Sequence, residues 1–487
     1  LPGVLGLEFV RHYNSLLPGN IGLGGGWRHS YATVLQVHKG FKPGETDFIK
    51  LQQSDGRIIR FRRVGERKVG AQYATRNYAD GFIATTEYGY QWHWRSGRIA
   101  SFDDRGLLVQ LKQGKKVLSL TYSGSGQLLS VTDPQGRRLS LAYSRGMLAR
   151  VTDPEQGVTK YRYSQEKQLV KVIRPNGDER HYHYQDETRG WHLTGITDER
   201  GIRVENYGYD EQGRATVSSK GLNTEKVSIV YEDAQRLVTN GLGESTVYVL
   251  GDVNGQKVIS EVRGPGCSAC SGGDIAYEYN DNLQVTKVTY KNGSTVEYDY
   301  DERGRTISQY RQPLNQARQL VAAYEYAGTG IQPSVIKRPS IAAGKFHTTQ
   351  MSYAADGQLL KVVESGYAPS TPLNDEAYEE GSLGYVAVSR SSEMEYDSKG
   401  QLVRIDGPRS DVADELRLEY DARGYLSTLL LPSGQVQRVL SYDESGRPTQ
   451  LQQSGQTPTT IEYNAYGKPA TVTKGLRSVR YEYNELG

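Results

Sequence analysis

The stretch "TVEYDYDERGRTISQ", Thr295 to Gln309, contains the pattern that decides the fold. Tyr298 and Tyr300 are two residues apart, so in a strand, where side chains alternate, both lie on one face. Asp301 follows at once, and Gly304 stands three residues after it. An aspartate that accepts hydrogen bonds from the amides ahead of it, followed by a glycine with positive φ, makes a tight turn. The stretch therefore predicts half of a β-hairpin.

The same phrase recurs along the chain, for example as "YGYDEQG" from Tyr207 and "LEYDARG" from Leu418. Internal repetition of this kind decides the fold class before any single segment does. We expect structural roles, in strand and turn, for the repeated residues Tyr207, Tyr209, Asp210, Gly213, Tyr298, Tyr300, Asp301, Gly304, Tyr420, Asp421 and Gly424.

The period is about 21 residues, since the second aromatic residues Tyr122, Tyr143, Tyr163 and Tyr184 differ by 21, 20 and 21. A second strand and a proline-glycine turn, such as "LPSG" at 431–434, complete each period. About sixteen periods follow Tyr122, and their strands, about 4.8 Å apart, would make a flat ribbon roughly 150 Å wide. Because sheets twist and wide sheets curl, we predict an all-β fold of antiparallel strands that winds around itself.

The composition agrees with a thin wall. The chain has 36% hydrophobic residues and a mean hydropathy of -0.63, yet it contains 36 tyrosines and 55 glycines. Tyrosine rings must therefore supply much of the apolar surface. The net charge of +3, from 59 basic and 56 acidic residues, gives no reason to expect nucleic acid or an anionic membrane as a partner.

The chain contains no apolar run near the roughly 18 residues that span a bilayer, so we expect no membrane-spanning segment. Its first residues, "LPGVLGLEF", have neither the basic flank nor the cleavage site of a signal peptide. They also lack an initiator Met, so we interpret the chain as a piece of something longer. We divide it into a non-periodic β-rich segment, 1–117, and the repeats, 118–487, with irregular insertions at 251–273 and 366–384.

The repeat unit Y-x-Y-[DN]-x-x-G-[RQ], followed by a proline-glycine turn, resembles the YD repeat of the RHS family over roughly 119–487. The front of the chain, "LPGVLGLEFVRHYNS" and then "LGGGWRHSY" at 23–31, is similar to the segment that opens the shell of bacterial Rhs-type polymorphic toxins. The resemblance implies a spiral, hollow β-cage that encloses a toxic C-terminal segment of the same polypeptide until delivery. In that setting we expect Trp27 and Arg28 to fix the front segment to the wall or to plug an end.

The resemblance also implies a secreted, structural container and not an enzyme, with no cofactor. Such chains commonly belong to type VI secretion effectors or to related contact-dependent and insecticidal toxins. In the first group the usual partners are an immunity protein, a secretion spike protein and a chaperone. Shells of this family close with a Pro-x-x-x-x-Asp-Pro-x-Gly segment where self-cleavage occurs, whereas this sequence stops at "RYEYNELG". We therefore expect the autoprotease and the toxin to lie outside this chain. Two Asp-Pro pairs, Asp133-Pro134 and Asp153-Pro154, could be taken for this cleavage motif. Both stand where other repeats place turns, so we interpret them as turn residues.

Other chemistry is weakly supported. Cys267 and Cys270 have the spacing of half a zinc site, but a structural zinc needs four ligands, so reduced or disulfide-linked loop cysteines are favoured. His181 and His183 share a strand face at positions where other repeats carry acids, which favours a solvated or lumen-facing role over a metal pair. The tyrosines could also stack on sugars, and the alternative function is a cell-surface adhesin or carbohydrate-binding module. Their regular spacing favours ring ladders that pack the wall.

Overall fold

The computed structural model describes residues 5–17, 19–40, 47–67, 70–75, 77–94, 96–186, 189–265, 273–328, 330–370, 384–443, 446–464 and 467–483. Across these ranges the chain is all β, with a single 3-10 turn at Tyr78–Asp80 and no α-helix. The same ranges contain no helix that is long and apolar enough to cross a membrane.

The front of the chain forms two groups of strands. Two short strands, β1 (Arg11–Tyr13) and β2 (Trp27–His29), make a separate antiparallel pair. The main sheet begins with eight strands that precede the periodic part: β3 (Val34–His38), β4 (Phe48–Gln52), β5 (Ile58–Arg67), β6 (Gly70–Ala74), β7 (Phe82–Thr86), β8 (Gly89–His93), β9 (Arg98–Phe102) and β10 (Leu108–Gln113).

The periodic part continues the same sheet. Its earlier strands are β11 (Lys116–Tyr122), β12 (Leu128–Thr132), β13 (Arg138–Ser144), β14 (Met147–Thr152), β15 (Val158–Tyr163), β16 (Leu169–Ile173), β17 (Glu179–His183), β18 (Gly195–Thr197), β19 (Arg203–Tyr209), β20 (Ala215–Lys220), β21 (Thr224–Tyr231), β22 (Gln235–Thr239), β23 (Ser245–Val253), β24 (Gln256–Arg263) and β25 (Ile275–Tyr279).

Its later strands are β26 (Val285–Tyr290), β27 (Thr295–Tyr300), β28 (Thr306–Gln312), β29 (Gln319–Glu325), β30 (Val335–Pro339), β31 (Phe346–Tyr353), β32 (Leu359–Pro369), β33 (Tyr385–Tyr396), β34 (Leu402–Asp406), β35 (Leu416–Tyr420), β36 (Leu426–Leu430), β37 (Val436–Tyr442), β38 (Pro448–Gln453), β39 (Thr459–Tyr463), β40 (Pro469–Lys474) and β41 (Arg477–Arg480).

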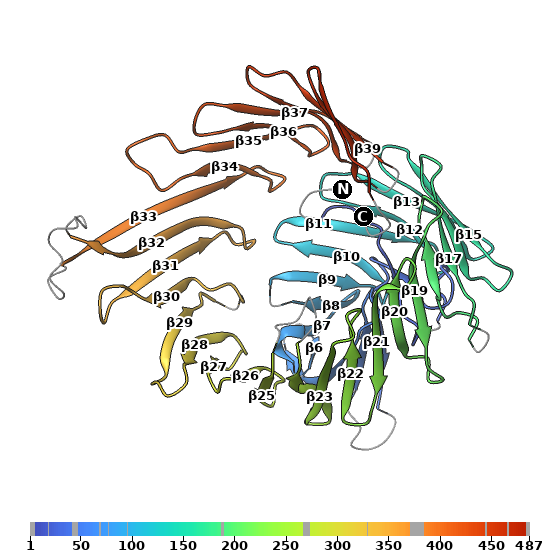
Figure 1. Ribbon diagram of the computed structural model, residues 1–487, viewed down its shortest axis with the longest axis horizontal. Helices are drawn as coiled ribbons and strands as arrows, with labels where there is room; N and C mark the ends of the chain where they lie inside the picture. The colour runs from blue at the N-terminus through green and yellow to red at the C-terminus, as the bar shows by residue number, and fades with distance from the viewer. Residues whose placement is uncertain are drawn as a thin grey trace.

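The sheet is a meander in which each strand from β3 to β41 pairs antiparallel with the next one along the chain. It coils as it proceeds: β29 to β34 lie across from β19 to β21, and β35 to β39 return toward β12 and β13 (Figure 1). The outer edge of β3 does not pair with another long strand. Instead, the Leu35 amide donates to the Gly106 carbonyl oxygen at 2.9 Å, beside an isolated bridge between Val34 and Leu107.

A seam joins one winding of the coil to the next. Lys116 Nζ donates to the Gly400 carbonyl oxygen at 2.9 Å, 284 residues along the chain. The Arg137 guanidinium reaches the Arg423 carbonyl oxygen at 3.2 Å, 286 residues away. The same guanidinium lies 5.6 Å from the ring centroid of Tyr425, which is 2% exposed. One winding therefore takes about 284 residues, and these contacts between windings are side-chain contacts and not a strand ladder.

The surface area shows that the wall is thin. The chain exposes 27,978 Å², whereas a compact monomer of 54.3 kDa would expose about 18,000 Å². A solid globule cannot carry so large an excess. One curved sheet layer, accessible from both sides over much of its length, accounts for it.

The buried core occupies only the first part of the molecule. One cluster of buried hydrophobic residues runs from Leu7 to Leu193. Beyond it, the buried hydrophobic residues of the described chain are Val262, Ile275, Ala322, Ala342 and Tyr425. The core therefore lies in the front strands β3 to β10 and in the first repeats, which an N-terminal segment covers, and the later strands form a wall without a comparable core.

The two predicted insertions differ from the structure. Residues 251–263, expected to be irregular, belong to the hairpin of β23 and β24, because the turn at 254–255 lets the strand pair continue. Residues 366–369 extend β32, which pairs with β33 up to Tyr385. Cys267 and Cys270 lie outside the described residues, as does most of the acidic stretch after Ser370.

Candidate functional site: the tyrosine face of the wall

The turn of each repeat is held by its aspartate. Asp301 Oδ1 accepts from the amides of Arg303 and Arg305, both at 2.9 Å. Gly304 donates its amide to the Asp301 carbonyl at 2.8 Å and has a φ of 70°. The equivalent glycines Gly213 and Gly424 have φ values of 81° and 84°. The turn therefore uses a conformation that residues with a β-carbon rarely adopt.

The same aspartate also links its turn to the following repeat, through an arginine side chain. Arg305 Nε donates to Asp301 Oδ2 at 2.7 Å, and the guanidinium lies 4.4 Å from the ring centroid of Tyr326 in the next repeat. Burial raises the pKa of Asp301 and the hydrogen bonds from Arg305 and Arg303 lower it, and the net shift is downward. The same aspartate-arginine-tyrosine contact joins Asp210, Arg214 and Tyr231, and also Asp443, Arg447 and Tyr463.

The second tyrosine of each phrase links consecutive repeats through its hydroxyl. Tyr300 donates to the Val285 carbonyl oxygen at 2.6 Å, across the strand pair β26 and β27. Equivalent bonds are made by Tyr122, Tyr163, Tyr184, Tyr209, Tyr231, Tyr279, Tyr326, Tyr353, Tyr396, Tyr420, Tyr442, Tyr463 and Tyr483. The spacing predicts ring-to-ring contact throughout, but among the periodic tyrosines of the described chain it is seen at Tyr277–Tyr279. A second tyrosine contact, Tyr425–Tyr442, involves Tyr425, which follows the turn glycine Gly424. The hydroxyl bonds are thus more regular than ring stacking.

The wall has two chemically different faces. Val296, Tyr298 and Tyr300 are half-buried and alternate with acids such as the exposed Asp299. We call the side with the paired tyrosines the tyrosine face and the other side the charged face. On the charged face, ion pairs cross between neighbouring strands, as between Lys361 and Glu393 at 2.7 Å. The tyrosine face continues as an apolar row that includes Met351, Val362, Met394, Ile405, Leu416, Leu418 and Leu429.

A segment of residues 5–31, here called the cover, packs on the tyrosine face of the first repeats. Trp27 Nε1 donates to the Tyr184 hydroxyl at 2.7 Å, and its ring meets Tyr182 edge-on at 4.9 Å. Tyr13 donates its hydroxyl to the Trp191 carbonyl at 2.7 Å. Arg28, expected to contact the wall beside Trp27, is instead buried with its guanidinium donating to the carbonyl of Ala32.

The glycine run of the cover allows its backbone to approach the wall. The Leu148 amide donates to the Gly22 carbonyl at 2.7 Å. At Gly24, a β-carbon would lie 3.0 Å from the Leu169 nitrogen, and φ is 99°. A larger side chain at Gly24 would therefore separate the cover from β16 or strain its backbone.

His29 is buried under the cover in its neutral form. Its pKa is lowered to about 3, mainly by burial and in smaller part by the nearby Arg28 and His12. The His29 ring stacks on Phe9 at 5.1 Å, and Nδ1 accepts the Tyr31 amide at 3.2 Å. The site is therefore built for an uncharged imidazole.

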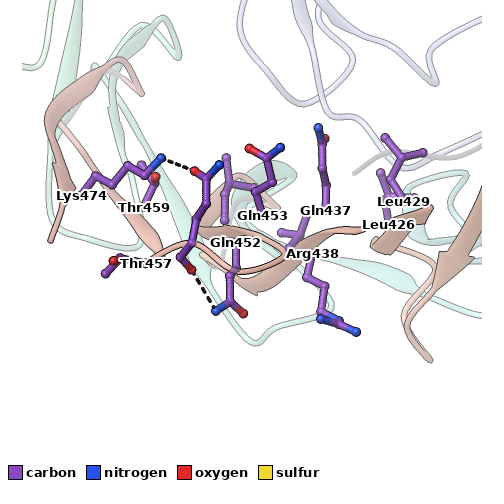
Figure 2. A pocket seen from close by; sticks show the side chains of 12 residues that line it. Leu426, Leu429, Gln437, Arg438, Gln452, Gln453, Thr457, Thr459 and Lys474 are labelled. Carbon is purple, nitrogen blue, oxygen red and sulfur yellow. Dashed lines mark hydrogen bonds between the residues drawn. The ribbon is translucent and has the colours of Figure 1, made fainter. Parts of the chain in front are cut away.

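Further along the tyrosine face, a polar cavity of about 240 Å³ interrupts the apolar row between β36 and β40. Gln437 pairs in register with Leu429 and Gln453, and Thr459 pairs with Lys474. Lys474 Nζ donates to Gln456 Oε1 at 2.5 Å. Figure 2 shows Gln437, Gln453 and Lys474 on one side of the strands and Arg438 on the other.

The weaker candidates from the sequence are placed as follows. His183 Nε2 lies 2.7 Å from Thr197 Oγ1, and His181 Nε2 lies 3.3 Å from Glu179. Among the described residues, no group of three or more histidine, cysteine or acidic side chains could hold a metal ion. Asp133 and Asp153 accept amide hydrogen bonds within their own turns.

Two sets of contacts could not be predicted from the sequence. Arg11 and Tyr13 of the cover reach residues more than 170 positions away, as do Lys116 and Arg137 at the seam. Nothing local marks these side chains, because their partners are brought close only by the coil. The glycines of "LGGGWRHSY" were the signal available for the cover, since they indicate close backbone approach.

Comparisons with known proteins show which family models and solved structures this chain is similar to. Residues 1–61 match a family model described as a domain of unknown function, DUF6531, and residues 122–158 match the RHS Repeat. The solved structure of TcdB2-TccC3 has the same fold, with a TM-score of 0.51 and 12% identity, and the alignment covers 93% of this chain and 30% of that one. The described chain is all β, with its repeats wound into one antiparallel sheet, and this confirms the fold class expected from the repeats.

Within this chain, residues 122–158 are similar to the RHS Repeat. A curated relative, the double-stranded DNA deaminase toxin A of Burkholderia cenocepacia (strain H111), is 25% identical over 413 residues, which are 72% of this chain and 27% of the relative. This chain thus spans between a quarter and a third of the length of these two relatives. The curated relative is itself a toxin.

Proposed function

We propose that this chain is the wall of an Rhs-type toxin shell, which encloses a C-terminal toxin segment of the same polypeptide and sequesters it until delivery. The observation that carries the proposal is the tyrosine face itself. The cover buries this face in the first repeats, whereas the same face of β27, β35 and β39 is half-exposed and carries tyrosine and aliphatic side chains. Partly exposed apolar side chains that recur from strand to strand are typical of a binding surface.

The physical mechanism is confinement. A wall of paired strands keeps an enclosed segment from its targets, and an apolar face favours contact with a chain that has not buried its own apolar side chains. The chain's contribution is then structural and not enzymatic. The proposal includes secretion of the assembled toxin, with a type VI machine as the route and an immunity protein, a spike protein and a chaperone as partners.

Limited proteolysis of the longer polypeptide, which contains the wall and the segment that follows it, tests the proposal. We expect the following segment to resist protease for as long as the wall remains folded, and to remain bound to the wall after any cleavage between them. Cutting of that segment at the rate of the isolated segment would contradict confinement.

Two matched variants test whether the tyrosine face is the surface that protects the enclosed segment. Met394→Glu places a charge on the tyrosine face and should speed cleavage of the enclosed segment, whereas Ser391→Glu, at an exposed position of the same strand, should not. Equal effects of the two variants would argue against the tyrosine face as the enclosing surface. Saturable binding of the wall to a glycan array, without protection of any segment, would favour the alternative of a surface adhesin.

A further inference from the structure

The cover shows how the tyrosine face holds a cation. The Arg11 guanidinium lies 5.8 Å from the ring centroid of Tyr161 and donates to the Tyr182 hydroxyl at 3.1 Å. These two residues are the first tyrosines of consecutive repeats, and both are buried, at 3% and 5% exposure. No carboxylate pairs with Arg11 among the described contacts. Two tyrosines, through one ring face and one hydroxyl, therefore hold a buried guanidinium.

The same pair of tyrosines recurs in the uncovered wall with the same register. Tyr161 pairs with Val172, which pairs with Arg180, and Tyr182 follows two residues later. Tyr277 pairs with Val288, which pairs with Val296, and Tyr298 follows two residues later. The Tyr277–Tyr298 pair therefore has the backbone placement of the Tyr161–Tyr182 pair, two strands apart.

The hydroxyls differ between the two pairs. Tyr182 is bonded to Arg11, whereas in the described chain neither Tyr277 nor Tyr298 has a hydrogen bond to its hydroxyl, although both rings are half-buried. Burial raises the pKa of Tyr298, so this hydroxyl stays neutral and offers a lone pair to a donor. The acids next to it in sequence, Glu297 and Asp299, point to the charged face, where Arg318 pairs with both.

We propose that Tyr277 and Tyr298 form a guanidinium-binding site that takes an arginine side chain from an extended polypeptide segment. The surface is continuous with the one that the cover already occupies, so the occupant has the chemistry of the cover. This inference rests on the proposed function for the source of the arginine, which is the enclosed segment.

The test uses the intact chain and a synthetic peptide with the sequence of residues 5–31, labelled for fluorescence anisotropy. We expect saturable binding that weakens about tenfold when the peptide carries Arg11→Gln, because a hydrogen bond to a charged group and a ring contact are lost. Tyr298→Phe in the chain should weaken binding of the unchanged peptide by a similar factor, and should leave binding of the Arg11→Gln peptide unchanged. This variant loses no intramolecular hydrogen bond, so we expect it to fold.

Two control variants test whether the peptide binds at Tyr277 and Tyr298. Tyr310→Phe lies on the charged face, where Arg318 sits 3.6 Å from its ring centroid, and should leave peptide binding unchanged. Tyr182→Phe should also leave it unchanged. If Tyr182→Phe alters binding as much as Tyr298→Phe, the peptide has replaced the chain's own cover, and the inference is wrong.

Equal binding of the two peptides would overturn the inference as well. The proteolysis experiment on the longer polypeptide is independent of these peptides. Protection of the enclosed segment together with equal peptide binding would therefore reject the arginine site and leave the proposed function standing.

Discussion

The covered repeats, β11 to β18, and the uncovered wall, β25 to β40, are built from one repeat but are stabilised differently. Both have the aspartate turn, and both have the tyrosine hydroxyl bond, as at Tyr184 and Tyr300. Only the covered repeats add a hydrophobic core, since Tyr182 is 5% exposed while its counterpart Tyr298 stays half-buried. The difference teaches that the wall forms without a hydrophobic core, from strand pairing, the turn and the hydroxyl bond. Each repeat then depends mainly on its neighbours, as in other repeat proteins.

The largest expected effect on stability comes from removing Trp27, which fixes the cover to the first repeats. Trp27→Ala deletes a buried ring and its bond to Tyr184, so we expect the covered repeats to lose about 3–5 kcal/mol of stability. Hydrogen exchange followed by mass spectrometry should show faster exchange in β13 to β18 and unchanged exchange in β25 to β40. Uniform acceleration along the whole chain would show that the two regions unfold as one unit.

A turn variant should act locally in the uncovered wall. Gly304→Val places a β-branched residue at a φ of 70°, which should cost about 1–3 kcal/mol and loosen β27 and β28. Gly124→Ala is the matched control, because that glycine also lies in a repeat turn, lacks a positive φ and has open space around it. Unchanged melting and protease resistance for Gly304→Val would show that this turn does not hold the strands.

Acid should weaken the covered repeats selectively. Because His29 has a folded pKa of about 3, below its ordinary 6.5, its stabilising contribution is complete above pH 6.5 and falls as the pH drops toward 3. The expected loss is about 1.4 kcal/mol per pH unit in that window. Burial also lowers the pKa of His93 and His183, which adds in the same direction.

Urea unfolding of the covered repeats at pH 7.5 and 5.0, with His29→Asn as the comparison, measures this dependence. The variant should be less stable at pH 7.5 but show a flatter pH response. An equally steep response in the variant would assign the acid sensitivity to other groups.

The smallest expected effect is the difference in stability between variants of the two tyrosines in one repeat. Tyr300→Phe removes the hydroxyl that donates to Val285 and should cost about 1 kcal/mol. Tyr298→Phe removes a hydroxyl without a partner in the described chain and should change stability by much less. Denaturation midpoints of the two variants, compared with the wild type, measure the difference, and equal losses would remove the structural distinction between the two positions.

The local part of this architecture could be predicted from the sequence. The alternation of Tyr298 and Tyr300, and the spacing of Asp301 and Gly304, depend on backbone periodicity and turn chemistry, which act within a few residues. The role of the second tyrosine could not be foreseen, because its hydroxyl bonds to a carbonyl about fifteen residues earlier, such as that of Val285. Spacing alone does not distinguish this bond from ring stacking.

The long-range part could not be predicted for a different reason. Whether Tyr182 is buried and Tyr298 half-exposed depends on where the cover docks, and both residues are the first tyrosine of the same Y-x-Y phrase. The seam between Lys116 and Gly400 depends on the curvature accumulated over a whole winding. Neither property is encoded in one window of sequence.

The seam has a consequence for how such walls change during evolution. A barrel closed by a strand ladder fixes its strand number, because the last strand must match the first in register. Here Lys116, Arg137 and Arg200 bind main-chain carbonyl oxygens of the next winding, groups that every residue possesses. Gain or loss of a whole repeat would offer these side chains another carbonyl in place of the old one. A lineage can therefore lengthen or shorten its wall, and so fit containers to contents of different size, without redesigning the closure.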